Sequence, residues 1–580
     1  MARISPGATG AGEKEAQGQE ASPPGFSSFL CRTMLRGAFL PCLSLLLLAR
    51  LTQACPVGCD CFKQEVVCTD EDIVDIPEGI PENATEIIFV ETSMLTLRSW
   101  ALRNTSSLAK VVFLNTKIQS LQEEAFGGLI GLLDLEITGS PLVGLQGETF
   151  RNLTKLQKLT LNFNTLRALP ADLFQGLDTL ESLHLQGNQL QTLPDAIFQP
   201  LEALLFLNLA QNLLGQISEQ LLAPLASLQT LKLSDNVLAT LPPRAFRGLG
   251  KLQELFLDGN GITELPRDVF SGLGALEKLW LQHNAIGHLP PTVFSSLGNL
   301  TFLNLQGNAL RVLPEGLFQR TPKLARLSVS NNRLENVSVG AFGNAPKLSV
   351  VTLSHNSLRS LPPGLFDGTP RLAKLYLGSN NLTALDRRLF QNLSQLEVLS
   401  LADNVLTTLP DGIFDNNLGL FNLALHGNPW ACDCHLAYLL NWIREYMDRF
   451  FNLQTYCATP DYLKGQVLPA LQTEQLVCPV PLEPHRLRAF LLGKEEEVGS
   501  SWDAAEQDRA PTRCAYSNLD GTVVLACENE VCRWLRVQLS PRQTSGSPGL
   551  TLNATQEWVL KSSCGSVLVT LSMNALGGGG

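Results

Sequence analysis

The His, Cys, Ser and acidic residues of this chain are not spaced as in any of the common catalytic motifs. The sequence contains no H-E-x-x-H, no G-x-S-x-G and no glycine-rich phosphate loop. Four of the seven His lie in or just after a short Leu-x-Leu segment that recurs every 24 residues: His184, His283, His355 and His426. Each of these His is at least three copies of the segment away from the next. We therefore expect solvated surface histidines and predict no catalytic residue, no cofactor and no metal site.

The cysteines indicate disulfide frameworks rather than reactive thiols. There are 14, and twelve of them fall into three groups of four. Even groups of Cys are typical of disulfide frameworks in exported proteins, and zinc is disfavoured because no paired C-x2-C knuckles occur. We predict bonds only within each group: Cys55, Cys59, Cys61 and Cys68; Cys432, Cys434, Cys457 and Cys478; Cys514, Cys527, Cys532 and Cys564.

The N-terminal region predicts export. An apolar stretch over residues 38–49 follows Arg36 and precedes small residues, as in a secretory signal with cleavage after Ala54. A membrane anchor is the alternative, but the stretch is shorter than the roughly 20 residues that span a bilayer. We predict residues 1–54 as a signal region, with Met34 as the true start, and a secreted mature protein.

Charge and sequons agree with an extracellular glycoprotein. The net charge of −11 argues against nucleic-acid binding, which needs clustered Lys and Arg. Eight Asn-x-Ser/Thr sequons follow the signal region, and none has Pro at the middle position. We predict N-glycosylation at these sites: Asn83, Asn104, Asn152, Asn299, Asn336, Asn381, Asn392 and Asn553.

Internal repetition defines the fold. Twelve Asn recur with a constant 24-residue period from Asn164 to Asn428, each in the frame L-x-x-L-x-L-x-x-N-x-L. This is the leucine-rich repeat pattern, in which short strands stack into one parallel sheet with leucines buried. Thr92, Thr116 and Ser140 occupy the Asn place in earlier frames, where a hydroxyl can do part of the work of the amide. We predict an α/β solenoid, a leucine-rich repeat horseshoe of about fifteen repeats over residues 84–430, with a parallel concave sheet.

A phased column of phenylalanines completes the predicted core. Fourteen residues before each repeat residue from Ser140 to Asn428 stands a Phe, with Leu222 as the one departure among thirteen places. Solenoid ends need caps, and cysteine caps are expected at residues 55–83 and 431–480. Residues 481–580 are predicted to be a linker followed by a small β-rich disulfide module. Its expected strands cover residues 521–527, 532–539 and 567–571.

Aromatic residues at outward strand positions predict a binding surface. Phe256 and Trp280 hold the same place in adjacent repeats, Phe302 lies on the next strand, and Phe206 flanks them. Rings on neighbouring strands form an apolar patch of the kind that anchors protein partners. Plain surface aromatics, or rings shielded by glycan, are the alternative.

Several segments together resemble one family. They include Cys55-Pro-Val-Gly-Cys-Asp-Cys-Phe62, Ile87-Ile-Phe-Val-Glu-Thr-Ser93, Leu375-Tyr-Leu-Gly-Ser-Asn-Asn-Leu382 and Gly521-Thr-Val-Val-Leu-Ala-Cys527. From about Met34 to near its C-terminus, the chain is similar to the regulatory, leucine-rich repeat subunits of the carboxypeptidase N family.

The resemblance implies a glycosylated plasma protein that binds, stabilises and carries a catalytic subunit in a hetero-oligomer. That partner is a zinc carboxypeptidase that removes C-terminal Lys or Arg from circulating peptides, and no catalytic residue transfers to this chain. The resemblance also implies the cap pairs Cys55–Cys61, Cys59–Cys68, Cys432–Cys457 and Cys434–Cys478. The alternative function is an extracellular matrix or receptor-like protein that binds protein ligands on its concave face.

Overall fold

The computed structural model describes residues 55–446 and 455–477 in full, and the backbone of five strands between residues 515 and 572. The chain divides into two compact units, Met1–Ala54 and Cys55–Gly580. The predicted signal region is the first unit and lies outside the described residues. Within the described part of the chain, no helix is long and apolar enough to cross a membrane.

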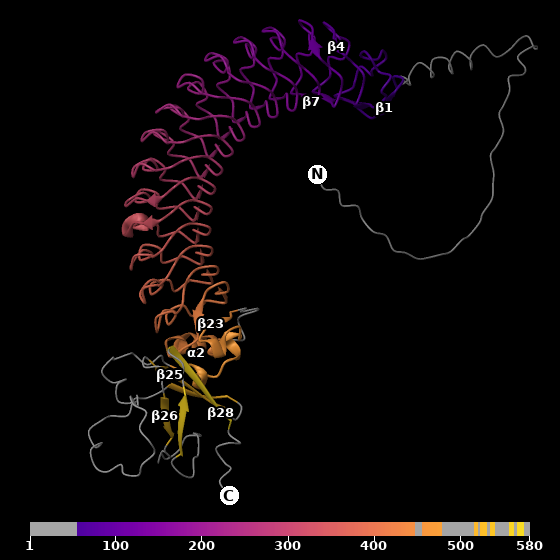
Figure 1. The fold of residues 1–580 in the computed structure, drawn as a ribbon. Coiled ribbons are helices and arrows are strands. Elements are labelled where there is room, and N and C mark those ends of the chain that lie inside the picture. The colour runs from indigo at the N-terminus through magenta and orange to yellow at the C-terminus, as the bar shows by residue number, and fades with distance from the viewer. Residues whose placement is uncertain are drawn as a thin grey trace, which may run out of the picture. The chain divides into compact units, whose positions relative to one another are not determined.

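A 17-stranded sheet runs through the repeats, and each strand pairs with the strand of the next repeat (Figure 1). The first two strands are antiparallel, and all later neighbours are parallel. In spatial order the strands are β1 (Cys59–Phe62), β2 (Glu65–Cys68), β3 (Glu86–Val90), β5 (Lys110–Leu114), β7 (Asp134–Thr138), β8 (Lys158–Thr160), β9 (Ser182–His184), β10 (Phe206–Asn208), β11 (Thr230–Lys232), β12 (Glu254–Phe256), β13 (Lys278–Trp280), β14 (Phe302–Asn304), β16 (Arg326–Ser328), β18 (Val350–Thr352), β19 (Lys374–Tyr376), β20 (Val398–Ser400) and β21 (Asn422–Ala424).

The register of the sheet follows directly from the repeat period. Leu183 of β9 pairs with Leu207 of β10, and the same place is filled by Leu231 in β11. These leucines are fully buried, while the residues on either side of them in β9 are partly exposed. The predicted parallel-sheet solenoid with leucines inside is confirmed.

Helical structure is sparse in the described part of the chain, so the α component of the predicted α/β solenoid is small. Short two-stranded pairs lie between the strands of the sheet and in the segment after the last repeat, and one α-helix also lies after the last repeat. These elements are β4 (Thr96–Leu97) with β6 (Ser120–Leu121), β15 (Val312–Leu313) with β17 (Asn336–Val337), β22 (Trp430–Ala431) with β23 (Cys457–Thr459), α2 (Ala437–Glu445), and the 3-10 turns η1 (Val339–Phe342), η2 (Cys434–Leu436), η4 (Asp461–Leu463), η5 (Leu468–Ala470) and η6 (Thr473–Gln475).

The repeated Asn joins each repeat to the one before it. Asn236 illustrates the pattern: its Nδ2 donates to the carbonyl oxygen of Leu209 at 3.0 Å and to that of Leu233 at 3.1 Å. Its Oδ1 accepts from the backbone N–H of Leu214 at 3.0 Å. The same contacts recur down to Asn428. Each buried amide thereby satisfies backbone groups that the turn would otherwise leave unpaired.

The three hydroxyl residues that replace the Asn do not all find a hydrogen-bond partner. Thr116 and Ser140 hydrogen-bond each other through their hydroxyls at 2.8 Å, and the backbone N–H of Ser140 donates to Asn164 at 3.0 Å. Thr92 is fully buried, and its hydroxyl has no hydrogen-bond partner among the described residues. The expectation that a hydroxyl takes over part of the amide's role is therefore wrong at Thr92.

The phenylalanine column is buried and stacked. From Phe246 to Phe366, six consecutive rings stack with centroids 5.8 to 6.2 Å apart. Leu222, the one departure, is also fully buried and fills the place between Phe198 and Phe246. The column runs along the side of the core opposite the sheet.

The residue just before each repeated Asn has a left-handed backbone. Its φ lies between 52° and 73°, whether the residue is Gly or not. At several of these places a side chain in one repeat lies over a Gly in the next: a Cβ on Gly187 would stand 2.4 Å from the Phe163 ring. Likewise, a Cβ on Gly259 would stand 2.2 Å from the Asp235 carboxylate.

Disulfides close both ends of the solenoid. The structure contains Cys55–Cys61, Cys59–Cys68 and Cys432–Cys457, which are pairs that the resemblance implies. Cys434 is also disulfide-bonded, while its implied partner Cys478 lies outside the described residues.

The C-terminal region contains antiparallel strands. One sheet joins β24 (Ala515–Leu519), β25 (Thr522–Asn529) and β28 (Gly565–Ser572), and β26 (Trp534–Leu539) pairs with β27 (Gln556–Lys561). The three predicted strand segments correspond to β25, β26 and β28, and β24 and β27 are additional. The predicted linker and the bonds of Cys514, Cys527, Cys532 and Cys564 lie outside what the structure describes.

Candidate functional site

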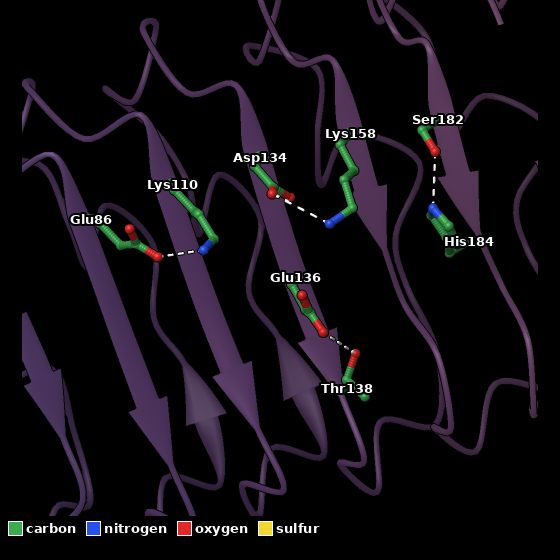
Figure 2. Close-up of polar contacts among 8 residues, drawn as sticks. All are labelled: Glu86, Lys110, Asp134, Glu136, Thr138, Lys158, Ser182 and His184. Atoms are coloured by element: carbon green, nitrogen blue, oxygen red, sulfur yellow. Dashed lines mark hydrogen bonds and ion pairs between the residues drawn. The ribbon is translucent and has the colours of Figure 1, made fainter. Parts of the chain in front are cut away.

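The outward side chains of the sheet form a continuous surface whose chemistry changes along the chain. In its first part, oppositely charged residues on adjacent strands pair across the sheet (Figure 2). Lys110 of β5 pairs with Glu86 of β3, and Lys158 of β8 lies 3.4 Å from Asp134 of β7. The hydrogen bond and the charge of Glu86 raise the pKa of Lys110. These charges neutralise one another, so this part of the surface offers few unpaired groups.

The four predicted binding aromatics lie on the next part of the surface, and three of them touch. The Phe256 and Trp280 rings stack with centroids 3.8 Å apart and an interplanar angle of 7°. The Trp280 and Phe302 rings are 5.3 Å apart and tilted by 46°. Phe206 stands two strands before Phe256. We call Phe206, Phe256, Trp280 and Phe302 the aromatic row; all four are half-buried.

A lysine fills the place between the separated rings. Lys232 of β11 has its Nζ 5.5 Å from the centroid of the Phe206 ring and 5.1 Å from that of Phe256. Both distances are within cation–π range. The aromatic row is thus continuous from β10 to β14. The sequence analysis did not identify Lys232, although Lys232 holds the same place in its repeat as Phe256 does in the next one.

His184 extends the aromatic row by one strand. Its ring lies 4.8 Å from that of Phe206, and its Nε2 hydrogen-bonds the Ser182 hydroxyl at 2.9 Å (Figure 2). Burial, followed by the charges of Lys158 and Lys232, lowers the pKa of His184 to about 4. The expectation of a solvated histidine is therefore wrong for His184, which is half-buried because Phe206 covers it. His283, His355 and His426 are exposed as expected.

No arrangement among the described residues supports catalysis. The Ser182–His184 pair has no carboxylate hydrogen-bonded to the imidazole in the described part of the chain, so nothing orients it as a base. Asp433, Cys434 and His435 lie close enough together to suggest a metal site. The Cys434 sulfur is already in a disulfide, and this removes the thiolate that a metal would need.

The sequons lie away from this surface. None of the seven sequon residues within the described ranges is on a strand of the 17-stranded sheet. Six of the seven are exposed; Asn299 is partly buried, with its Nδ2 donating to the carbonyl oxygen of Gly274 at 2.8 Å. Asn553 lies outside the described residues.

The fold and its repeated Asn define a class of protein-binding solenoid, and the comparison with known families agrees. The leucine rich repeat model matches eight overlapping segments that together cover residues 106–310 and 322–429, more than half of the chain. The chain belongs to the leucine-rich repeat family, whose solenoids present extended binding surfaces.

Two curated relatives are similar over a shorter region. The chain is 59% identical over 164 residues to human carboxypeptidase N subunit 2, which is 28% of this chain and 30% of that protein. It is 56% identical over 161 residues to the mouse protein, or 27% of this chain and 29% of that protein. The match thus spans about a third of the length of these relatives.

Among solved structures, a leucine-rich repeat protein of Leptospira interrogans is similar with a TM-score of 0.53 and 25% identity. The match covers 62% of this chain and 90% of that one. Together these similarities support a protein-binding leucine-rich repeat scaffold. The disulfides at both ends fit an extracellular protein.

Proposed function

We propose that this chain is a secreted, N-glycosylated and non-catalytic plasma protein. It binds, stabilises and carries the catalytic subunit of a zinc carboxypeptidase that removes C-terminal Lys or Arg from circulating peptides. The aromatic row is the observation that carries the proposal, because it is an apolar surface on a chain without assembled catalytic groups in its described part. The similarity to carboxypeptidase N subunit 2 supports this choice of partner.

The geometry of the aromatic row suits it to anchor a protein. Trp280 stands at its centre, with Phe256 stacked on one side and Phe302 on the other. The three rings are half-buried and pack against one another, so part of their side-chain entropy is already lost before binding. Large aromatic residues in such central positions commonly contribute most of the binding energy of an interface.

None of the described sequon residues lies on a strand that carries the aromatic row. The described sequon residues lie in turns, in an irregular segment for Asn381, or on the separate strand β17 for Asn336. Asn299 comes closest to the aromatic row, three residues before Phe302. A partner could therefore contact the strands while carbohydrate covers other faces of the solenoid.

The test is to replace the central ring and measure association. Trp280→Ala is expected to weaken binding to the catalytic subunit at least about 30-fold, which corresponds to about 2 kcal/mol. Thermal stability should stay nearly unchanged, because Trp280 is on the outer face of the sheet. Tyr376→Ala is the matched control: Tyr376 is a half-buried aromatic at the same strand position, four repeats later.

Affinity is measured with the purified full chain and the purified catalytic subunit at several concentrations. The full chain alone is expected to show no peptidase activity. Unchanged affinity in the combined Phe256→Ala, Trp280→Ala and Phe302→Ala variant would place the docking site elsewhere, first of all in the C-terminal region after Pro481.

A further inference from the structure

Positive charge is concentrated in one part of an otherwise acidic chain. Residues 311–388 contain eleven Lys or Arg and four Asp or Glu, a net charge of +7, whereas the whole chain carries −11. Such segregation creates a local positive potential in spite of the negative total. The repeats over this range are β16, β18 and β19 with their connecting turns.

Five of these cations gather at one edge of the sheet. Lys323, Lys347 and Arg371 each stand three residues before the first residue of β16, β18 and β19. Because these strands pair in register, the three side chains form a row with a step of about 4.8 Å. Arg326 and Lys374 are the first residues of β16 and β19, beside that row. We call these five residues the basic cluster.

The basic cluster is exposed and has no acidic partner. All five residues are exposed, and none lies within 4.0 Å of a carboxylate in the described part of the chain. Lys323 donates only to the side-chain oxygen of Asn299, at 2.7 Å.

Lysines earlier on the same sheet show what a paired arrangement looks like. Lys278 of β13, for example, lies 2.7 Å from Glu254 of β12. Strands β14, β16, β18 and β19 contain no Asp or Glu with which the basic cluster could pair in this way. Like charges at this spacing repel one another, and the fold itself does not relieve the repulsion.

We propose that the basic cluster binds a linear sulfated polysaccharide. A straight row of cations at a constant step matches a chain that carries regularly repeated anionic groups. Contacts of this type gain affinity from charge neutralisation and release of counterions, and they need no apolar anchor. The residues just before the strands are small, namely Ala325, Ser349 and Ala373. Val350, which pairs with both Arg326 and Lys374, is a partly exposed apolar side chain between the cations. A single Val is far less than the apolar core of a protein interface. This inference does not depend on the proposed peptidase partner.

The experiment measures binding of the full-length chain to heparin at about 0.15 M salt, after enzymatic removal of N-glycans because the Asn299 sequon lies at the same edge. The variant carries Lys323→Gln, Lys347→Gln and Arg371→Gln. Its affinity should fall about tenfold, or about twofold for each exposed cation removed. Binding of the unmodified chain should weaken as salt rises.

The matched control carries Arg311→Gln, Arg333→Gln and Arg359→Gln. These three exposed cations come from the same repeats, but they follow the strands, and Glu335 lies among them. Both variants lose three positive charges, so the change in net charge is identical. Its heparin affinity should stay within about twofold of the unmodified chain, because these cations lie outside the row and salt at about 0.15 M screens charges that are not in direct contact. Fully desulfated heparin should not bind at all. Thermal unfolding of both variants should match that of the unmodified chain, because all six side chains are exposed.

Three results would overturn the proposal. The first is no heparin binding by the deglycosylated full chain, and the second is an equal loss in the two variants. The third is normal heparin binding by the Lys323, Lys347 and Arg371 variant together with loss of its complex with the catalytic subunit. That last result would assign the basic cluster to an acidic protein surface instead.

Discussion

The repeated Asn allows the stability of the solenoid to be tested at a single amide. Asn236 is 6% exposed and makes four hydrogen bonds to the backbone of its own and neighbouring repeats. We predict that Asn236→Ala destabilises the protein by about 2–4 kcal/mol. One buried backbone N–H loses its only hydrogen-bond partner, and three backbone carbonyl oxygens each lose one of two partners.

The individual bonds give this magnitude. The N–H of Leu214 donates only to Asn236, so the substitution leaves a buried donor unsatisfied, at about 1–3 kcal/mol. The carbonyl oxygen of Leu209 keeps a bond from Asn212, and that of Leu233 keeps one from Asn260. The carbonyl oxygen of Ser234 keeps its bond from the N–H of Gln211. These three carbonyls add a smaller cost, about 1 kcal/mol together.

The assay is urea unfolding of the full chain, with amide hydrogen exchange followed in the peptides around Leu214. Asn344→Ala is the matched control, because Asn344 is exposed and makes one hydrogen bond, to the carbonyl oxygen of Gln319 at 3.2 Å. The control should change the unfolding free energy by less than about 0.5 kcal/mol. Equal effects of the two substitutions, or no faster exchange at Leu214, would refute the assigned role of the amide.

Two further predictions concern backbone strain and pH. Gly187→Ala should destabilise the protein by about 1–2 kcal/mol, because φ is +71° and the new Cβ would meet the Phe163 ring, whereas Gly215→Ala should be neutral in the same melting assay. Since the pKa of His184 falls to about 4 in the folded protein, its contribution to stability is complete above about pH 6.5 and is lost as the pH falls towards 4. His184→Gln should remove this pH-dependent part of the unfolding free energy; identical pH profiles for the two proteins would contradict this.

The sequence predicted the parts of the fold that depend on strict periodicity. Leucines at strand centres, the repeated Asn and the phenylalanine column each occupy a fixed place in the repeat frame, and their burial follows from that place. The aromatic row was also predictable, because Phe256 and Trp280 share one frame position on the outer face of the sheet.

Other features depended on what stands in the neighbouring repeat. Thr92 lacks a partner because the residue one repeat later, Thr116, bonds Ser140 instead. His184 is half-buried because Phe206 stands beside it, and Lys232 lies between two rings because Phe206 and Phe256 are two strands apart. The left-handed position has no single residue type to mark it, since Gly, Asn, Asp, Phe and His all occur there.

Between Asp235 and Gly307, bulky residues and Gly alternate at that left-handed position, and this limits which repeats can be removed there without loss of fit. Asp235 lies over Gly259, and His283 lies over Gly307. Excising one repeat, residues 236–259, would bring Asp235 against His283 without a Gly to receive it. Excising two repeats, residues 236–283, would instead place Asp235 over Gly307 and restore the fit. Excising the single repeat 260–283 would also keep the fit, because it removes His283 and leaves Asp235 over Gly259. In this part of the solenoid, the choice of repeat therefore decides whether each bulky side chain keeps a Gly beneath it.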